Sequence, residues 1–290
     1  MASITRHVQG EVQKTIAKSF ESLCGRHGRW EVWADWITLS ACSVSNTVDA
    51  AHRDSREKTY RNIQQKYTEP EMQAFSAMLG NVILALEENP DQDLLGYLYM
   101  NLDLGNEHIG QFFTPYNICR FMAQMNADKI KEEVEAKGWI SVGDPTCGAG
   151  AMLVAFANEC LRHGVNYQTN VLIVAQDIDY VVGMMCYIQM SLIGCAGYVV
   201  ISDSLAHPST SYDDRGLIPR DNGNVWYTPL YFHKVWHWRR VWAQVKRMCA
   251  PKEVSPGPQL EQRTQKKASP PPEPAKLTFA ENKNGQLTLF

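Results

Sequence analysis

The sequence predicts an α/β fold in which a parallel β-sheet is covered by helices and is preceded by a helical domain. Two observations lead to this prediction. From about Glu11 to Met100, apolar residues return at three- and four-residue spacing, which is typical of helices with one buried face. From Trp139 onward, short apolar runs alternate with helical stretches, which indicates βαβ units and therefore a parallel sheet.

The N-terminal region, residues 1–105, is expected to form a small helical domain. Within it, Trp30, Trp33 and Trp36 follow one another at three-residue spacing. This stripe has two interpretations: a platform on which bases stack, or a packed helix face, which is the more common use of such spacing.

The second region, residues 106–250, is expected to hold the sheet. Strands are predicted at 139–144 (WISVGD), 170–177 (NVLIVAQD) and 197–203 (GYVVISD). Helices are predicted at 151–164, 181–194 and 232–248. Strands and helices in this alternation form the front half of a doubly wound sheet.

Composition limits the class of protein. A net charge of −3 excludes a basic nucleic-acid coat, so any groove for DNA has to be built locally. The eight cysteines show no C-x-x-C pair and no zinc-ligand spacing, which predicts reduced thiols and no metal site. No signal peptide and no membrane-length apolar segment is found, so we expect a cytoplasmic protein without a membrane partner.

A glycine-rich turn, Asp144-Pro145-Thr146-Cys147-Gly148-Ala149-Gly150, lies between the first predicted strand and its helix. Glycines let the backbone approach a ligand closely, and the N-terminus of the following helix favours a carboxylate. The turn departs from the dinucleotide pattern G-x-G-x-x-G because it opens with an acid and lacks the third glycine. It therefore predicts a positively charged cofactor with a carboxylate tail.

Two acids end the next two predicted strands, Asp177 in AQDID and Asp203 in ISDS. Open α/β sheets bind ligands at this edge. An acid after the second strand can accept both ribose hydroxyls, and one after the third can accept an exocyclic amine, so the pair outlines an adenosine. Taken singly, a glycine turn is often only a tight connection and an Asp only a helix cap.

The segments GNEHIGQFFTP, DPTCGAGAMLVAFA, AQDID and SDSL, in this order, resemble the motif series of adenine-N6 DNA methyltransferases, especially the modification subunits of type I restriction systems. The resemblance covers about Leu95 to Leu205. It implies a Rossmann-like methyltransferase sheet, S-adenosylmethionine as the cofactor, methylation of adenine N6 and double-stranded DNA as the partner.

The resemblance also implies which residues form the site. Asp177 would hold the ribose and Asp203 the adenine. The full set of implied cofactor-binding residues is Phe113, Thr114, Pro115, Asp144, Thr146, Gly148, Gly150, Asp177 and Asp203.

The chain departs from this family in its catalytic tetrapeptide. The family carries a polar residue followed by Pro-Pro and an aromatic residue. The polar side chain accepts a hydrogen bond from the target amine, and the aromatic ring stacks on the flipped base. The nearest candidate here is Thr228-Pro229-Leu230-Tyr231, so Thr228, Pro229 and Tyr231 are predicted as a degenerate catalytic loop. An equally open interpretation is a strand end leading into a helix.

The sheet region is also short, because one helix, residues 232–248, separates Tyr231 from the proline-rich stretch. A shortened sheet would be completed by a specificity subunit or a second copy. Alternatively, the chain is an inactive module that binds S-adenosylmethionine and DNA. The helix itself mixes tryptophans with basic residues, which suits DNA binding, although such a helix also packs its rings on a sheet edge with a solvated basic face.

The C-terminal segment is expected to be a tether with a docking peptide. Residues 251–285 are rich in proline and charge and predict a disordered stretch. Beyond it, Gln286, Leu287, Leu289 and Phe290 match the Gln-Leu-x-Leu-Phe form of peptides that dock on the bacterial replication sliding clamp. The alternative is an apolar tail that adds a strand to its own domain.

Overall fold

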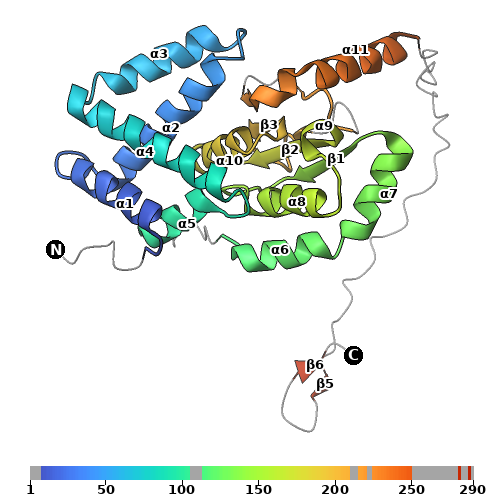
Figure 1. Ribbon diagram of the computed structural model, residues 1–290, viewed down its shortest axis with the longest axis horizontal. Helices are drawn as coiled ribbons and strands as arrows, with labels where there is room; N and C mark the ends of the chain where they lie inside the picture. The colour runs from blue at the N-terminus through green and yellow to red at the C-terminus, as the bar shows by residue number, and fades with distance from the viewer. Residues whose placement is uncertain are drawn as a thin grey trace, which may run out of the picture. The chain divides into compact units, whose positions relative to one another are not determined.

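The computed structural model describes residues 8–104, 113–209, 215–220, 224–249, 280–281 and 287–288. The chain divides into two compact units, Met1–Cys249 and Ala250–Phe290. Within the first unit, a group of helices stands beside a sheet that has helices on both faces (Figure 1). The α/β class predicted from the sequence is thus confirmed.

The N-terminal part of the first unit is helical. Its helices are α1 (Glu11–Leu23), α2 (Arg29–Asn46), α3 (Arg53–Gln64), α4 (Glu69–Glu88) and α5 (Leu94–Asn101). The tryptophan stripe lies on α2, where Trp33 and Trp36 are buried and Trp30 is 44% exposed. Trp33 packs edge to face on Phe20 of α1, so the stripe is mainly a packed helix face.

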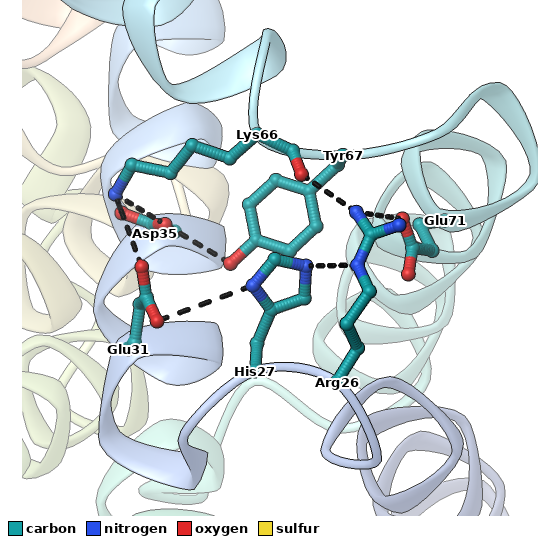
Figure 2. Close-up of polar contacts among 7 residues, drawn as sticks. All are labelled: Arg26, His27, Glu31, Asp35, Lys66, Tyr67 and Glu71. Atoms are coloured by element: carbon teal, nitrogen blue, oxygen red, sulfur yellow. Dashed lines mark hydrogen bonds and ion pairs between the residues drawn. The ribbon is translucent and has the colours of Figure 1, made fainter.

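A polar network fixes the loops at one end of this helical part (Figure 2). The buried carboxylate of Asp35 on α2 lies 2.9 Å from Lys66 Nζ and accepts a hydrogen bond from Tyr67 Oη at 3.0 Å. Arg26 donates to the Lys66 carbonyl at 2.8 Å and lies 3.3 Å from Glu71. Because a buried carboxylate is stable only with donors around it, this network holds the α1–α2 loop against the α3–α4 loop.

The sheet part follows. Its helices are α6 (Tyr116–Gln124), α7 (Ala127–Lys137), α8 (Ala151–Arg162), α9 (Tyr167–Asn170), α10 (Tyr180–Leu192), the 3-10 helix η4 (Pro229–Phe232) and α11 (Lys234–Cys249). Its strands are β1 (Ile140–Asp144), β2 (Val171–Asp177), β3 (Ala196–Ile201) and β4 (Val225–Tyr227). The strand order is β1-β2-β3-β4, with β1, β2 and β3 parallel and β4 antiparallel to β3.

The central strand β2 is buried on both faces, as its continuous apolar run predicts. Leu172 and Val174 point to the face covered by η4 and α11, where Trp236 is fully buried. Ile173 and Ala175 point to the other face, toward α8 and α10. The first unit therefore has α11 on one side of the sheet and α8 on the other (Figure 1).

The helical part and the sheet share one hydrophobic core. A polar contact joins them as well: Arg56 on α3 donates to the Val225 carbonyl at 2.7 Å and pairs with Asp49 at 2.7 Å. Its guanidinium lies 4.0 Å from the ring centroid of Trp226. Helix α3 therefore contacts β4 directly.

In the second unit, β5 (Ala280–Glu281) pairs antiparallel with β6 (Leu287–Thr288). The predicted tether falls almost entirely outside the described residues, as do Gln286, Leu289 and Phe290. In the part of the chain that is described, the helices are too short or too polar to cross a membrane.

Candidate cofactor site

The glycine-rich turn connects β1 to α8 at the carboxyl edge of the sheet. The main-chain N–H of Thr146 donates to the Asp144 carboxylate at 3.2 Å, and that of Gly150 donates to the Cys147 carbonyl at 2.8 Å. Gly148 and Gly150 adopt φ of 55° and 95°, which side-chain-bearing residues rarely do. This backbone explains why glycine stands at both positions.

Asp177 joins the turn from the neighbouring strand. Its carboxylate accepts hydrogen bonds from the N–H of Gly148 at 2.9 Å and from the N–H of Asp179 at 2.9 Å. Because β1 and β2 are parallel neighbours, their carboxyl ends meet, and Asp144 and Asp177 face the same region. The second predicted acid is therefore part of the same construction as the turn.

A pocket of about 220 Å³ opens over the turn. Its lining residues are Phe113, Thr114, Cys119, Asp144, Thr146, Cys147, Gly148, Ala149, Ala151 and Met152. The structure thus brings together five of the residues predicted from sequence: Phe113, Thr114, Asp144, Thr146 and Gly148. Pro115 stands beside them as the N-cap of α6, and Gly150, the last residue of the turn, packs against Cys186 and Met190 of α10.

The N-terminus of α8 is available to a ligand. Its N-cap is Gly150, no side chain caps the helix, and Ala151 and Met152 of its first turn line the pocket. The first N–H groups of a helix lack partners within the helix and attract anions. A carboxylate is the kind of group that this end of the pocket suits.

Phe113 lines the pocket next to Gly148. Its ring stacks on Tyr99 of α5, with centroids 5.3 Å apart and planes 25° from parallel. A Cβ added to Gly148 would lie 3.4 Å from Phe113 Cδ1. The glycine therefore permits the aromatic ring to sit directly over the turn.

A buried polar contact holds the turn from behind. The side-chain amide of Gln189 on α10 donates to the Ala149 carbonyl and to the Asp93 carboxylate, each at 2.8 Å. Its oxygen accepts from the N–H of Leu95 at 3.1 Å, and Asp93 caps α5 through the N–H of Gly96. One fully buried glutamine thus links α5, α10 and the turn.

The two acids of the site carry raised pKa values. Burial raises the pKa of Asp144, the charge of Asp177 adds to the rise, and the N–H of Thr146 opposes it. Burial likewise raises the pKa of Asp177 against the N–H groups of Asp179 and Gly148, and the charge of Asp179 adds to it. A positively charged ligand in the pocket would relieve this unfavourable burial of negative charge.

Asp203 lies apart from this pocket. It is exposed, and its carboxylate accepts from the N–H groups of Leu205 at 2.8 Å and Ala206 at 3.2 Å in its own turn. The N–H of Ala206, followed by that of Leu205, lowers its pKa. The structure places Asp203 at the expected edge of the sheet, next to the end of β2, but not among the residues that line the pocket.

The predicted catalytic loop lies at the other edge of the sheet. Because β4 runs antiparallel to β3, Thr228 follows β4 at the point where β3 begins. Its buried hydroxyl donates to the Cys195 carbonyl at 2.7 Å and accepts from the N–H of Gly197 at 3.0 Å. Pro229 begins η4.

Tyr231 is buried as well: it stacks on Tyr227 and donates from its hydroxyl to the Leu217 carbonyl at 2.9 Å. The structure does not bring Thr228, Pro229 and Tyr231, the residues predicted as a degenerate catalytic loop, together with the residues that line the pocket. They form a strand end leading into a helix, away from the glycine turn.

Sequence reasoning missed the glutamines that support the site. Gln189 and Gln176 are both buried. Gln176 donates to Ser202 and to the His207 carbonyl at 3.0 Å and so holds the loop after β3. The signal was present, since each is a polar residue inside an otherwise apolar run, and such residues are buried only with partners.

No metal centre is formed by the described residues, in which no three His, Cys, Asp or Glu side chains are grouped to hold an ion. All seven cysteines with described side chains are free, and six of them are buried. They behave as small apolar residues, as the sequence predicted.

Comparison with known proteins identifies the family. Residues 92–239, just over half of the chain, match the family described as N-6 DNA methylase. No curated protein and no solved structure matches the chain. The match starts one residue before Asp93, the N-cap of α5, includes the glycine turn and Asp177, and ends within α11. The chain therefore belongs to the N-6 DNA methylase family.

Proposed function

We propose that this protein binds S-adenosylmethionine in the pocket over the glycine turn and transfers its methyl group to adenine N6 in double-stranded DNA. The single observation that carries the proposal is the hydrogen bond from the N–H of Gly148 to the Asp177 carboxylate, which ties the end of β2 to the turn, while Asp144 and the first turn of α8 line the pocket above it. Membership of the N-6 DNA methylase family supports the reaction and the substrate.

The chemistry of the pocket suits this cofactor at each end. S-adenosylmethionine supplies an electrophilic methyl group on a positively charged sulfur. The N-terminus of α8 offers N–H groups to the cofactor carboxylate, and Asp144 offers a negative charge near the amine or the sulfur. Asp177 offers a carboxylate to the ribose hydroxyls, and Phe113 shields the pocket from water.

Titration calorimetry of the full chain with S-adenosylmethionine tests the binding step. We expect saturable binding, and we expect Asp177→Asn to weaken it at least about tenfold because the neutral amide no longer offers a full negative charge. Glu135→Gln, an exposed change on α7, is the matched control and should leave the affinity unchanged. Absence of binding by the unaltered protein would remove the proposal.

Transfer of a labelled methyl group to adenine-containing duplex DNA tests the reaction. The expected result is label at adenine N6 and no label in control duplexes that lack adenine. Recognition of a particular sequence is measured by comparing duplexes of different sequence in the same assay.

A second candidate function is a module that binds the cofactor and DNA without methylating. The observation in its favour is the burial of the Thr228 hydroxyl between main-chain groups of β3, which leaves that side chain unable to hold a target amine. Cofactor binding in calorimetry combined with no label in DNA would favour this module over the enzyme.

We also propose that a further chain, either a type I specificity subunit or a second copy, extends the sheet. In support of this, β1 is an edge strand of the described sheet, and Phe121 on α6 and Met125, the C-cap of α6, are 61% and 71% exposed. Light scattering of the purified chain tests the second copy: a monomer at all concentrations would exclude it.

The C-terminal peptide is proposed to dock on the bacterial replication sliding clamp, with Leu287, Leu289 and Phe290 filling apolar pockets and Gln286 at the rim. A cytoplasmic location is part of this proposal. Removal of residues 286–290 should abolish capture by immobilised clamp, whereas Lys283→Ala, just before the peptide, should not. Capture that persists after the removal would refute this role.

A further inference from the structure

A second pocket, of about 530 Å³, lies at the edge of the sheet opposite to the glycine turn. Its position follows from Trp139, which directly precedes β1 and lines the pocket. Its charged and aromatic lining residues are Lys137, Trp139, Arg215, Arg239, Trp242 and Lys246. No acidic side chain is among the described residues that line it, although Lys137 pairs with the nearby Glu133 at 2.7 Å.

Two guanidinium groups are fixed beside the same indole. Arg215 Cζ lies 3.7 Å from the ring centroid of Trp139, and Arg239 Cζ lies 5.7 Å from it. Arg215 donates to the Trp139 carbonyl at 3.0 Å, and Arg239 donates to the carbonyls of Thr169 and Gly138. Because these contacts orient the groups in advance, little side-chain entropy is lost when an anion binds.

The two arginines repel one another. Burial lowers the pKa of Arg239, and the positive charge of Arg215 lowers it further. The helix α11 that supplies one side of the pocket contains five basic residues and no acidic one in its sequence. An anion placed in the pocket would offset this repulsion.

Exposed indoles stand beside the cations. Trp238 and Trp242, one turn apart on α11, are 65% and 61% exposed. Lys246 Nζ lies 5.8 Å from the ring centroid of Trp242. Large exposed rings next to fixed positive charges are the pairing with which proteins bind nucleic-acid strands, since bases stack on the rings while phosphates meet the cations.

We propose that this pocket binds the phosphates of a single DNA strand, whose bases stack on Trp242 and Trp238. The site is separate from the cofactor pocket and does not rest on methyl transfer. The positively charged groups of the pocket would recognise the phosphate oxygens of the strand. A strand is favoured over free phosphate because only a strand brings bases to the exposed indoles.

Fluorescence anisotropy of a labelled single-stranded oligonucleotide with the full chain tests the proposal. Lys246→Glu and Trp242→Ala change exposed side chains and should each weaken binding at least about fivefold, with Lys246→Glu also reducing the salt slope by about 1. The matched controls are Lys18→Glu on α1 and Leu84→Ala on α4, an exposed charge and an exposed large apolar side chain outside the pocket. Both should bind as the unaltered protein does.

Three results would overturn the proposal. Unchanged affinity in both pocket variants would show that the strand binds elsewhere. If labelled duplex bound equally well and lost the same affinity in the pocket variants, the preference for a single strand would be refuted. If labelled polyglutamate did so, the preference for nucleic acid would be refuted. Displacement of the oligonucleotide by inorganic phosphate at an equal concentration of phosphate groups would identify a site for free phosphate.

Calorimetry with S-adenosylmethionine on the same preparations separates this proposal from the proposed function. Pocket variants that lose the oligonucleotide should keep the cofactor affinity of the unaltered protein. A protein that binds the oligonucleotide here but never binds S-adenosylmethionine would refute the proposed function and leave this site standing.

Discussion

Gln189 donates a hydrogen bond to the main-chain carbonyl of Ala149 at 2.8 Å, from a side chain that is fully buried. The same amide nitrogen donates to the Asp93 carboxylate, whose pKa is raised by burial. The glycine turn is thereby tied to the N-terminus of α5. The pocket over the glycine turn depends on this support because Ala149 lines it.

Replacement of Gln189 by leucine should destabilise the fold and weaken cofactor binding. The change removes both donated bonds and leaves Asp93 short of a donor, which costs about 1–3 kcal/mol. Urea unfolding measures the first effect and S-adenosylmethionine titration the second. Gln244→Leu, at an exposed position of α11, is the control. Equal stability of the Gln189 variant and the control would contradict a supporting role.

Cofactor affinity should fall as the pH is lowered, and the fall should begin above pH 3.8, the ordinary pKa of an aspartate. The reason is that burial raises the pKa values of Asp144 and Asp177. Protonation of these acids removes the negative charge that faces the cofactor. Stability should follow the opposite sense: a raised pKa means that the folded state holds protons more tightly, so these groups contribute less stability as pH rises through that window. Calorimetry and urea unfolding over a pH series measure both trends. Affinity that stays constant down to pH 3.8 would argue against ionised acids in the site.

Thr228→Val should lower stability and leave methyl transfer per folded molecule unchanged. The valine cannot donate to Cys195 or accept from Gly197, and an unsatisfied buried N–H costs about 1–3 kcal/mol. Thr228→Ser keeps the hydroxyl and serves as the control. Loss of transfer with unaltered stability would restore the catalytic interpretation of this loop.

Two glycine-to-alanine changes should act in opposite directions. At Gly150, φ is 95° and a Cβ would lie 2.9 Å from Cys186 Sγ, so alanine should destabilise the fold by about 1–3 kcal/mol and weaken cofactor binding. Gly80 lies within α4, where a Cβ meets nothing within 4 Å, so alanine should stabilise by about 0.5–1 kcal/mol. Thermal unfolding of the two variants compares them, and a stabilised Gly150 variant would refute the close packing inferred here.

Periodicity located most elements of the first unit. The runs at 151–164, 170–177 and 181–194 correspond to α8, β2 and α10, because a continuous apolar strand and a helix with one buried face follow from local spacing alone. The same reasoning anticipated that the turn and Asp177 would meet, since parallel neighbouring strands end at one edge. Local sequence sufficed there because spacing marks where each strand ends, and parallel neighbours bring those ends to one edge of the sheet.

The direction of β4 was beyond local sequence. The run Val225–Tyr227 has the same apolar character whether it joins β3 parallel or antiparallel, and only its pairing sends Thr228 to the far edge. Asp203 shows the same limit of local sequence. An aspartate after a strand reads the same in the sequence whether its carboxylate binds a ligand or accepts hydrogen bonds from its own turn, as it does here.

The amino-acid sequence by itself determined the α/β class, the family motifs and the residues of the glycine turn, because these depend on spacing within single elements. The tertiary structure alone decided that the Thr228 hydroxyl is buried against Cys195 and Gly197, that Gln189 supports the turn, and that Arg215 and Arg239 lie beside Trp139. The physical reason is distance: each contact joins residues far apart in the chain, and their meeting depends on how whole strands and helices pack.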